Sequence, residues 1–112
     1  MKILITCTIQ IDPKQRDIAL REAASLIEMA RQEPGCLAYN WGADMTADDT
    51  IYVYEEWLDQ ASLHAHFTAP SFFGMSEHLA KHGLIGAQAR KLLVEKECPI
   101  YDQEGTPRAD FF

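Results

Sequence analysis

The sequence predicts an α+β domain whose elements follow the order β-α-β-β-α-β. Three features lead to this prediction: an alternating apolar segment near the N-terminus, two more on either side of a polar loop, and helical patterns after the first and third segments. Alternation with period two is typical of strands, whereas apolar positions three and four apart are typical of helices. With right-handed connections this order gives a four-stranded antiparallel sheet with helices on one face, the ferredoxin-like fold.

The first strand is expected over residues 3–11, where isoleucines alternate with more polar residues. A helix is expected to begin at Asp12-Pro13. Asp12 is a good N-cap, Pro13 suits the first helical position, and Gln15 can complete a capping box. The segment Glu33–Gly35 combines proline with glycine and should end this helix.

Two strands are expected in the middle of the chain, over about Cys36–Ala43 and Ile51–Leu58, with the polar loop 44–50 between them. The later strand has two sets of side chains on opposite faces of the sheet. One set consists of Ile51, Val53, Glu55 and Trp57, and the other of Tyr52, Tyr54, Glu56 and Leu58. An acid therefore shares a face with large apolar side chains.

The C-terminal part is expected to contain two short helical pieces and one strand. Asp59 should cap the first helix, which runs to about Phe67, and Gly83 should end the second. The last strand is expected over about Lys91–Tyr101, followed by the polar tail Asp102–Phe112. Neither a linker nor a repeat interrupts residues 1–112, so a single domain is expected.

Charge and composition argue against several classes of function. A net charge of -7 leaves no basic surface for nucleic acid or for an anionic membrane. The three cysteines lack metal-binding spacing and suit free thiols in a reducing compartment. The N-terminus leads straight into a strand, and no apolar run approaches the ~20 residues that a membrane span needs. A cytoplasmic protein is therefore expected.

A second copy of the chain is the expected partner. The apolar content of 47% is high for 112 residues, and a sheet covered by helices on one face leaves the other face open. Two such sheets packed face to face would form a homodimeric α/β barrel.

The candidates for chemistry gather at the corner between the third strand and the following helix. Glu55 lies on an apolar face, where burial would raise its pKa and an imidazolium nearby would lower it. His64 and His66 can exchange protons near neutral pH, but they lie two residues apart, so at most one faces the sheet. The alternatives are a structural hydrogen bond for Glu55 and a surface or capping position for each histidine.

No metal or organic cofactor is predicted. His78 and His82 have the spacing of metal ligands on a helix, but neither an HExxH pattern nor an obvious third ligand accompanies them. The sequence also contains no glycine-rich nucleotide motif, no P-loop and no cysteine cluster. Nucleotide, flavin and iron–sulfur chemistry therefore have no support.

The chain resembles the antibiotic biosynthesis monooxygenase domain family, which consists of small dimeric α+β barrels and includes quinol monooxygenases. The resemblance covers roughly Ile3 to Ile100. It depends on the E-P-G-C-L-x-Y run at Glu33–Tyr39, the E-x-W at Glu55–Trp57, His66 in its A-H-F context, and the pair Phe72-Phe73.

This resemblance implies a monooxygenase that uses O2 without a metal or organic cofactor. A small aromatic, quinol-like or polyketide-like substrate would lose a proton in an apolar cavity, and the anion would reduce oxygen directly. His66 would be the acid/base and Glu55 its partner. The amide of Asn40 is expected, from its residue type, to donate to the anion. The expected substrate-binding residues are Trp57, Tyr39, Phe72 and His64.

The same fold is compatible with three other functions. Related haem-degrading proteins carry an asparagine on the first strand and a tryptophan on the helix after the third strand. This chain has Thr6, Cys7 and Thr8 on the first strand and His66 near the position of that tryptophan, which disfavours a haem-degrading role. A carbonyl isomerase that uses the same cavity, and a non-catalytic dimeric module that binds a small ligand, remain as alternatives.

Overall fold

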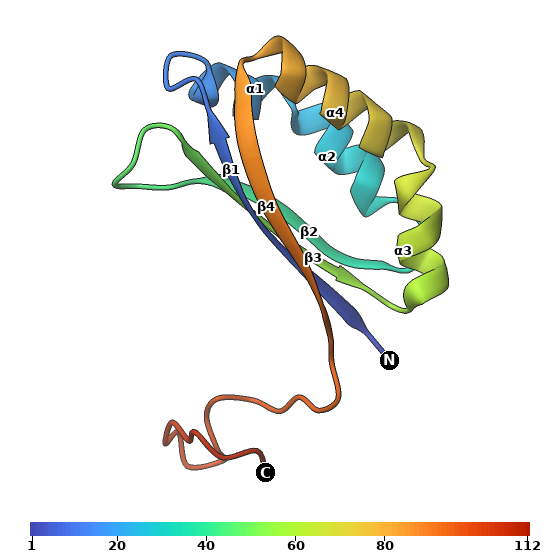
Figure 1. The fold of residues 1–112 in the computed structure, drawn as a ribbon. Helices are drawn as coiled ribbons and strands as arrows, with labels where there is room; N and C mark the ends of the chain where they lie inside the picture. The colour runs from blue at the N-terminus through green and yellow to red at the C-terminus, as the bar shows by residue number, and fades with distance from the viewer.

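The computed structural model describes residues 1–112 and contains one sheet with four helices (Figure 1). The strands are β1 (Ile3–Ile11), β2 (Cys36–Ala43), β3 (Thr50–Trp57) and β4 (Leu84–Leu93). The helices are α1 (Arg16–Glu22), α2 (Ala24–Arg31), α3 (Gln60–Phe67) and α4 (Pro70–Lys81). The predicted α+β class and ferredoxin-like arrangement are confirmed. The first expected helix is divided into α1 and α2, and the two helical pieces expected later in the chain are α3 and α4.

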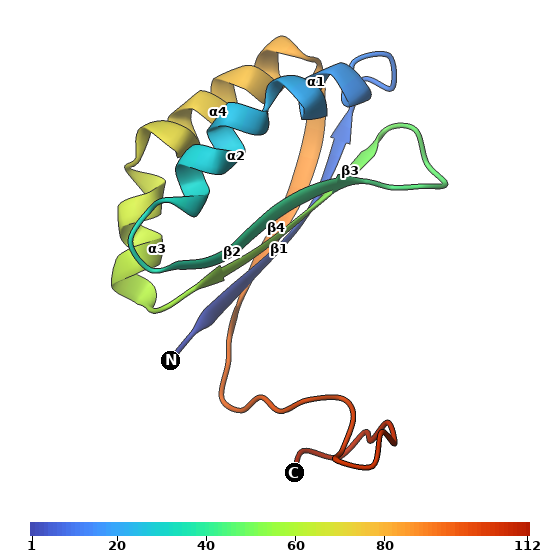
Figure 2. The same ribbon diagram turned by 180° about the vertical axis from the view of Figure 1, so that it is seen from behind.

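The sheet has the strand order β2-β3-β1-β4, and all neighbouring strands are antiparallel. All four helices lie on one of its faces, as the two opposite views show (Figures 1 and 2). The alternation in β1 and β3 sends every second side chain toward these helices. One core cluster consists of Ile9, Ile11, Ala19, Ala23, Ile51, Val53, Met75 and Leu79. The other consists of Ile3, Ile5, Ala30, Tyr39, Trp57 and Leu63, and it surrounds the candidate site.

The first helix begins later than predicted. Asp12 does not cap it: the Asp12 carboxylate accepts the backbone N–H of Lys14 at 2.9 Å, and α1 begins only at Arg16. Gln15 occupies the N-cap position without a side-chain cap bond, and its side chain contacts His82 instead. The backbone N–H of Asp12 is bound to the Gly83 carbonyl at 2.9 Å. Residue 12 therefore ties the end of β1 to the start of β4 instead of starting a helix.

The prediction for the last strand was wrong. β4 starts immediately after Gly83 and ends at Leu93, whereas the expected strand covered Lys91–Tyr101. The register explains its end, because Leu93 pairs with Ile3, the first residue of β1. Beyond that point β1 offers no backbone partner. The N-terminal half of β4 was missed because it contains Gly86, Ala87 and Ala89, which have low strand propensity.

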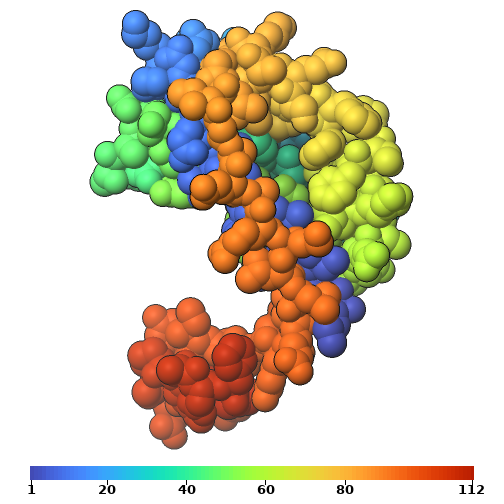
Figure 3. Space-filling view, viewed as in Figure 1, coloured from blue at the N-terminus to red at the C-terminus, as the bar shows by residue number.

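The C-terminal segment leaves the body of the protein (Figures 1 and 3). The backbone N–H of Val94 still donates to the Lys2 carbonyl at 2.9 Å, and Tyr101 and Pro107 then form the bridge of a small hairpin. The radius of gyration is 15.9 Å, whereas a compact domain of this length has about 13 Å. Large side chains stay exposed on this tail, namely Ile100, Tyr101, Phe111 and Phe112.

No helix of the chain has the length and apolar character that crossing a bilayer requires. The sheet face opposite the helices is uncovered and carries hydroxyl and aromatic side chains. Tyr52 and Tyr54 are exposed there, and their hydroxyls donate to Asp44 and Glu56, each at 2.6 Å. This outer face is therefore polar enough to meet water and aromatic enough to pack against another surface.

Candidate active site

Helix α3 carries the central residue of the site. Asp59 caps the helix, and its Oδ1 accepts the backbone N–H of Ser62 at 2.8 Å, as predicted. Leu63 and His66 lie three residues apart on the same helical face, and both are buried. Since the cap fixes where α3 begins, it also determines that His66 points toward the sheet while His64 stays exposed.

The turn between α2 and β2 brings Glu33 to the same place. Gly35 in this turn has a φ of 81°, and a Cβ at this residue would lie 2.0 Å from Ser62 Oγ. Only glycine allows the turn to approach α3 this closely. The backbone N–H of Leu58 also donates to the Gly35 carbonyl at 2.8 Å. The turn is therefore held against both the end of β3 and the start of α3.

His66 lies between two carboxyl groups. Its Nδ1 is 2.9 Å from Glu33 Oε1, and its Nε2 is 3.9 Å from Glu55 Oε1. The first distance is a hydrogen bond, whereas the second is too long for one but close enough for charges to interact. The other oxygen of Glu33 accepts the Ser71 hydroxyl. We therefore assign the Nδ1–H to the Glu33 bond, which leaves Nε2 of the neutral ring unprotonated.

Aromatic rings hold the imidazole in place. Trp57 stacks on it with a centroid distance of 4.6 Å, and Tyr39 and Phe72 meet it edge-on at 5.7 Å and 5.6 Å. Only 2% of His66 is exposed. The ring therefore has one orientation, as a positioned acid/base requires.

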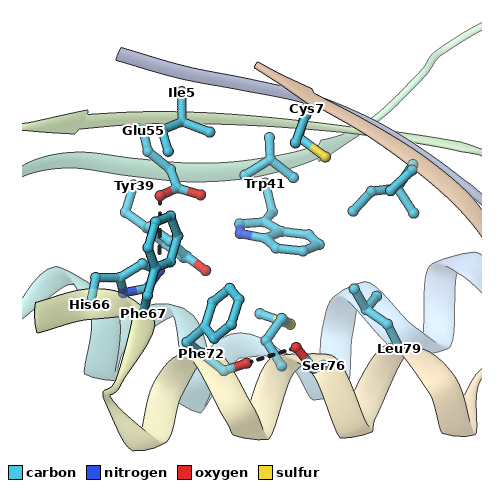
Figure 4. A pocket seen from close by; sticks show the side chains of 15 residues that line it. Ile5, Cys7, Tyr39, Trp41, Glu55, His66, Phe67, Phe72, Ser76 and Leu79 are labelled. Carbon is cyan, nitrogen blue, oxygen red and sulfur yellow. Dashed lines mark hydrogen bonds and ion pairs between the residues drawn. The ribbon is translucent and has the colours of Figure 1, made fainter. Parts of the chain in front are cut away.

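Glu55 is buried on the inner face of β3, with 8% of the residue exposed. Burial raises the pKa of its carboxyl, and the hydrogen bond from the Trp57 indole N–H at 2.9 Å and the adjacent His66 offset part of this rise. Figure 4 shows the carboxyl projecting from β3 toward His66. A carboxyl that keeps its proton above the usual range, next to an imidazole, is suited to proton exchange.

The raised pKa of Glu55 predicts how Glu55→Gln changes stability with pH. The folded state holds the Glu55 proton more tightly than the unfolded chain, where the pKa is near 4.5. The stabilising contribution is therefore complete below pH 4.5 and is lost as pH rises through the folded-state pKa. Glutamine does not titrate and can still accept the Trp57 N–H. We expect Tm of the variant minus Tm of the wild type to increase from pH 4 to pH 8, and a difference independent of pH would contradict the assignment.

An apolar cavity of about 220 Å³ lies between the sheet and helices α3 and α4, with His66 and Glu55 in its lining (Figure 4). Twelve of its fifteen lining residues are hydrophobic. Ligand pockets usually measure about 300–1,000 Å³, so this cavity is smaller than most and suits a ligand of one or two fused rings. Its exposed lining residues are Phe67, Ser76, Ala87 and Ala89. The mouth therefore lies where β4 faces the helices, and Figure 3 shows a hollow there.

Two hydrogen-bond donors from β2 line the cavity. Tyr39 is 3% exposed, and burial raises the pKa of its phenol, so the hydroxyl keeps its proton. The Trp41 indole N–H is buried without a hydrogen bond of ordinary geometry, although it lies close enough to the Tyr39 hydroxyl to lower the pKa of that group slightly. A buried donor without an acceptor is costly, and an oxygen atom of a ligand would satisfy the Trp41 N–H.

The structure brings some of the predicted site residues together and separates others. Tyr39 and Phe72 line the cavity with the predicted pair His66 and Glu55, whereas Trp57 is fully buried behind the pair. Two predicted residues lie elsewhere. Asn40 is exposed on the outer face of β2, where its Oδ1 accepts from Arg31 at 3.0 Å. His64 borders a separate surface hollow near Lys91.

Asn40 cannot act as an amide donor in this cavity, because neighbouring residues of a strand point to opposite faces. His64 cannot reach the cavity either, because it lies two residues from His66 and residues two apart on a helix point to different faces. His78 and His82 also have other partners. His78 Nε2 lies 2.8 Å from the Ala19 carbonyl, and His82 contacts Gln15 and Glu22. These two histidines join α4 to α1.

No site role was predicted for Glu33, and Trp41 was not included among the expected binding residues. Glu33 was expected to end a helix and to begin the run that resembles the family, yet it forms the shortest contact with His66. A signal was present, because an acid directly before a Pro-Gly turn is held at a fixed place once the turn is packed. Trp41 follows Tyr39 by two positions and therefore shares its face.

The fold and the site together define an α+β protein with a buried acid–base group at an apolar cavity. The chain belongs to the antibiotic biosynthesis monooxygenase family, whose sequence pattern matches residues 3–77. The protein sll1783 of Synechocystis, which is uncharacterised, is 31% identical over 70 residues, or 62% of this chain and 48% of the relative. This match therefore spans only about half of that relative.

Solved structures share the fold. A crystal structure from Deinococcus radiodurans has a TM-score of 0.80 at 16% identity and covers 89% of this chain and 99% of its own. SnoaB from Streptomyces nogalater, a cofactor-independent oxygenase, has a TM-score of 0.67 at 11% identity and covers 88% of this chain and 97% of its own. At these identities the likeness concerns the fold alone.

Proposed function

We propose that this protein is a cofactor-independent monooxygenase that oxidises a small aromatic quinol with O2. One observation carries the proposal: the imidazole of His66, held between Glu33 and Glu55, lies at the wall of an apolar cavity of a size that suits one or two rings. A histidine with one nitrogen bound to a carboxylate and the other unprotonated is arranged as a general base. SnoaB, which shares the fold, is a cofactor-independent oxygenase.

The first step is removal of a quinol hydroxyl proton by His66 Nε2. The resulting imidazolium lies 2.9 Å from Glu33 Oε1 and 3.9 Å from Glu55 Oε1, so both carboxyl groups are placed to stabilise its charge. The quinolate left in the cavity is electron-rich. Tyr39 and Trp41 supply O–H and N–H groups for its oxygen, the role that the sequence had led us to expect for Asn40.

Oxygen then reacts with the quinolate. One electron passes from the anion to O2, and the two radicals combine into a peroxide on a ring carbon. The peroxide takes up a proton, the O–O bond breaks, and water leaves, so that a quinol and O2 yield a hydroxyquinone and water. One oxygen atom enters the ring and the other becomes water, and the substrate supplies four electrons, two for each oxygen atom. His66 and Glu55 are the groups placed to return the proton.

The test is oxygen uptake with hydroquinone and 1,4-naphthoquinol, together with identification of the product. Quinols oxidise spontaneously to quinones and hydrogen peroxide, so the rate above background and the formation of hydroxyquinone are both needed. Turnover of enolisable ketones that consumes no oxygen would favour the carbonyl isomerase. Saturable quinol binding without any turnover would favour the ligand-binding module. Either of these results would overturn the monooxygenase proposal.

We also propose that the protein functions as a homodimer. The helices leave the outer face of the sheet open, and the tail beyond Leu93 exposes Ile100, Tyr101, Phe111 and Phe112 away from its own body (Figure 3). A tail with this much exposed apolar surface gains stability only by packing against another surface. The outer face of a second copy, with Tyr52 and Tyr54, offers aromatic side chains for such packing.

Light scattering is therefore expected to give twice the chain mass of 12.7 kDa. Removal of residues 99–112 should raise the dissociation constant of the dimer at least about tenfold, because the exposed apolar side chains of the tail are lost. The double variant Glu95→Gln, Lys96→Gln is a control, since it keeps the tail and changes only exposed residues. A wild-type monomer at micromolar concentration would contradict the dimer.

A further inference from the structure

His66 separates two spaces, and Glu33 is its contact on the outer side. The inner space is the apolar cavity, whose lining contains His66 and Glu55 but not Glu33. The outer space is an open surface hollow lined by Glu33, Pro34, Ala61, Ser62, Ala65 and Ala69. The Glu33 side chain is 17% exposed, whereas that of His66 is 2% exposed. A group that touches both His66 and the surface is thus already in place.

The two ring nitrogens face these two sides. Nε2 lies toward Glu55 and the cavity, at 3.9 Å from Glu55 Oε1, and Nδ1 is bound to Glu33 Oε1 at 2.9 Å. The other rings that contact His66 belong to Tyr39, Trp57, Phe67 and Phe72. Among these, only Tyr39 can ionise, and burial raises the pKa of its phenol. Glu33 is therefore the carboxyl group that connects the ring to solvent.

Proposed turnover requires such a connection. In the proposed turnover the quinol gives up one proton before O2 reacts and the peroxide takes up one proton afterwards, so a proton must leave the cavity and later re-enter it. Aromatic and aliphatic side chains line the cavity and offer this proton no carrier. A histidine can take a proton on one nitrogen and release another from the opposite nitrogen.

We propose that Glu33 is the proton port of the site, through which the cavity exchanges protons with solvent by way of His66. This inference deepens the proposed function and depends on it for its role in turnover. After Nε2 has gained the substrate proton, the imidazolium gives its Nδ1 proton to Glu33 Oε1, so one proton enters the ring and one leaves. Glu33 then releases its proton into the surface hollow. The same path in reverse restores the starting tautomer when Nε2 returns a proton to reduced oxygen.

The test compares Glu33→Gln with the wild type by NMR in the absence of substrate. Glutamine keeps the size of the side chain and an oxygen for the Nδ1–H bond, but it cannot carry the proton away. We expect an unchanged His66 tautomer, read from the ring ¹⁵N shifts. Exchange of the ring N–H with solvent should be at least about tenfold slower. Exchange at the wild-type rate in Glu33→Gln would overturn the proposal.

Two further variants separate proton transfer from structural damage. Glu33→Asp retains a carboxylate and should recover most of the exchange rate. Ser71→Ala removes the hydroxyl that donates to Glu33 and should leave the exchange rate within about twofold of the wild type. An equal slowing in Ser71→Ala would indicate that packing, not the Glu33 carboxylate, sets the rate, and would also overturn the proposal.

Measurement of turnover is a second test, and this one depends on the proposed function. With 1,4-naphthoquinol, Glu33→Gln should lower kcat at least about tenfold with KM unchanged, and added formate should restore part of the rate by carrying protons through the hollow. A lowered kcat that formate leaves unchanged would count against the port. If the wild type shows no oxygen uptake, the proposed function fails, while the NMR comparison still decides whether Glu33 is the port.

Discussion

Replacement of His66 by glutamine should lower the rate of quinol oxygenation by about 10²–10⁴-fold. Glutamine fills similar space and can still donate a hydrogen bond to Glu33, but it cannot accept a proton. The substrate would then have to ionise without a base in an apolar cavity, where an unassisted charge is costly. Oxygen uptake above the spontaneous rate, with circular dichroism as a check on folding, measures the effect.

His64→Gln is the matched control. It makes the same chemical change two residues away on the same helix, at an exposed side chain outside the cavity. Its rate should equal that of the wild type. His66→Ala adds a second check, because it leaves a space that free imidazole can enter, and imidazole in the assay should restore part of the lost rate. A folded His66→Gln enzyme that retains the full rate would remove His66 from the mechanism.

The elements with strong local signals were predicted closely. The bounds of β1 and β2 agree with the predicted ranges, and those of β3 differ by one residue at each end. The Asp59 cap also located the start of α3 correctly. In each case alternation or a cap fixes the structure within a few residues, and tertiary packing agrees with the local preference.

β4 shows where this agreement fails. Ala87 and Ala89 line the cavity opposite Ile9 and Cys7, and larger side chains there would fill it. The requirement for an open cavity thus removes the β-branched residues by which a strand is recognised. Deviations from local rules are expected at functional sites, and this deviation coincides with the mouth of the cavity.

The site was predictable only where its members are close in sequence. Glu55 and His66 are separated by eleven positions across one corner, and their proximity follows from a strand that leads directly into a capped helix. Glu33 is thirty-three residues before His66, and only the packing of the Gly35 turn against α3 joins them. Asn40 was assigned to the cavity because of its residue type, although the alternation of β2 already separates it from Tyr39.

Trp57 supports the site from behind, and its truncation to alanine should cost about 3–5 kcal/mol of unfolding free energy. The side chain is 0% exposed, stacks on His66 at 4.6 Å and donates to Glu55 at 2.9 Å. Alanine would leave a large void beside the imidazole and a buried carboxyl without its donor. Urea unfolding at one fixed protein concentration measures the loss, because dimer formation contributes to apparent stability.

Trp57→Phe separates the two contributions. Phenylalanine keeps most of the ring contact with His66 and loses only the N–H, so it should cost clearly less stability than alanine. Since the Trp57 hydrogen bond lowers the pKa of Glu55, its removal should raise that pKa further, and a ¹³C titration of the Glu55 carboxyl measures the change. A loss below about 1 kcal/mol for Trp57→Ala, or an unchanged Glu55 titration in Trp57→Phe, would show that the strand and helix position His66 and Glu55 without the indole.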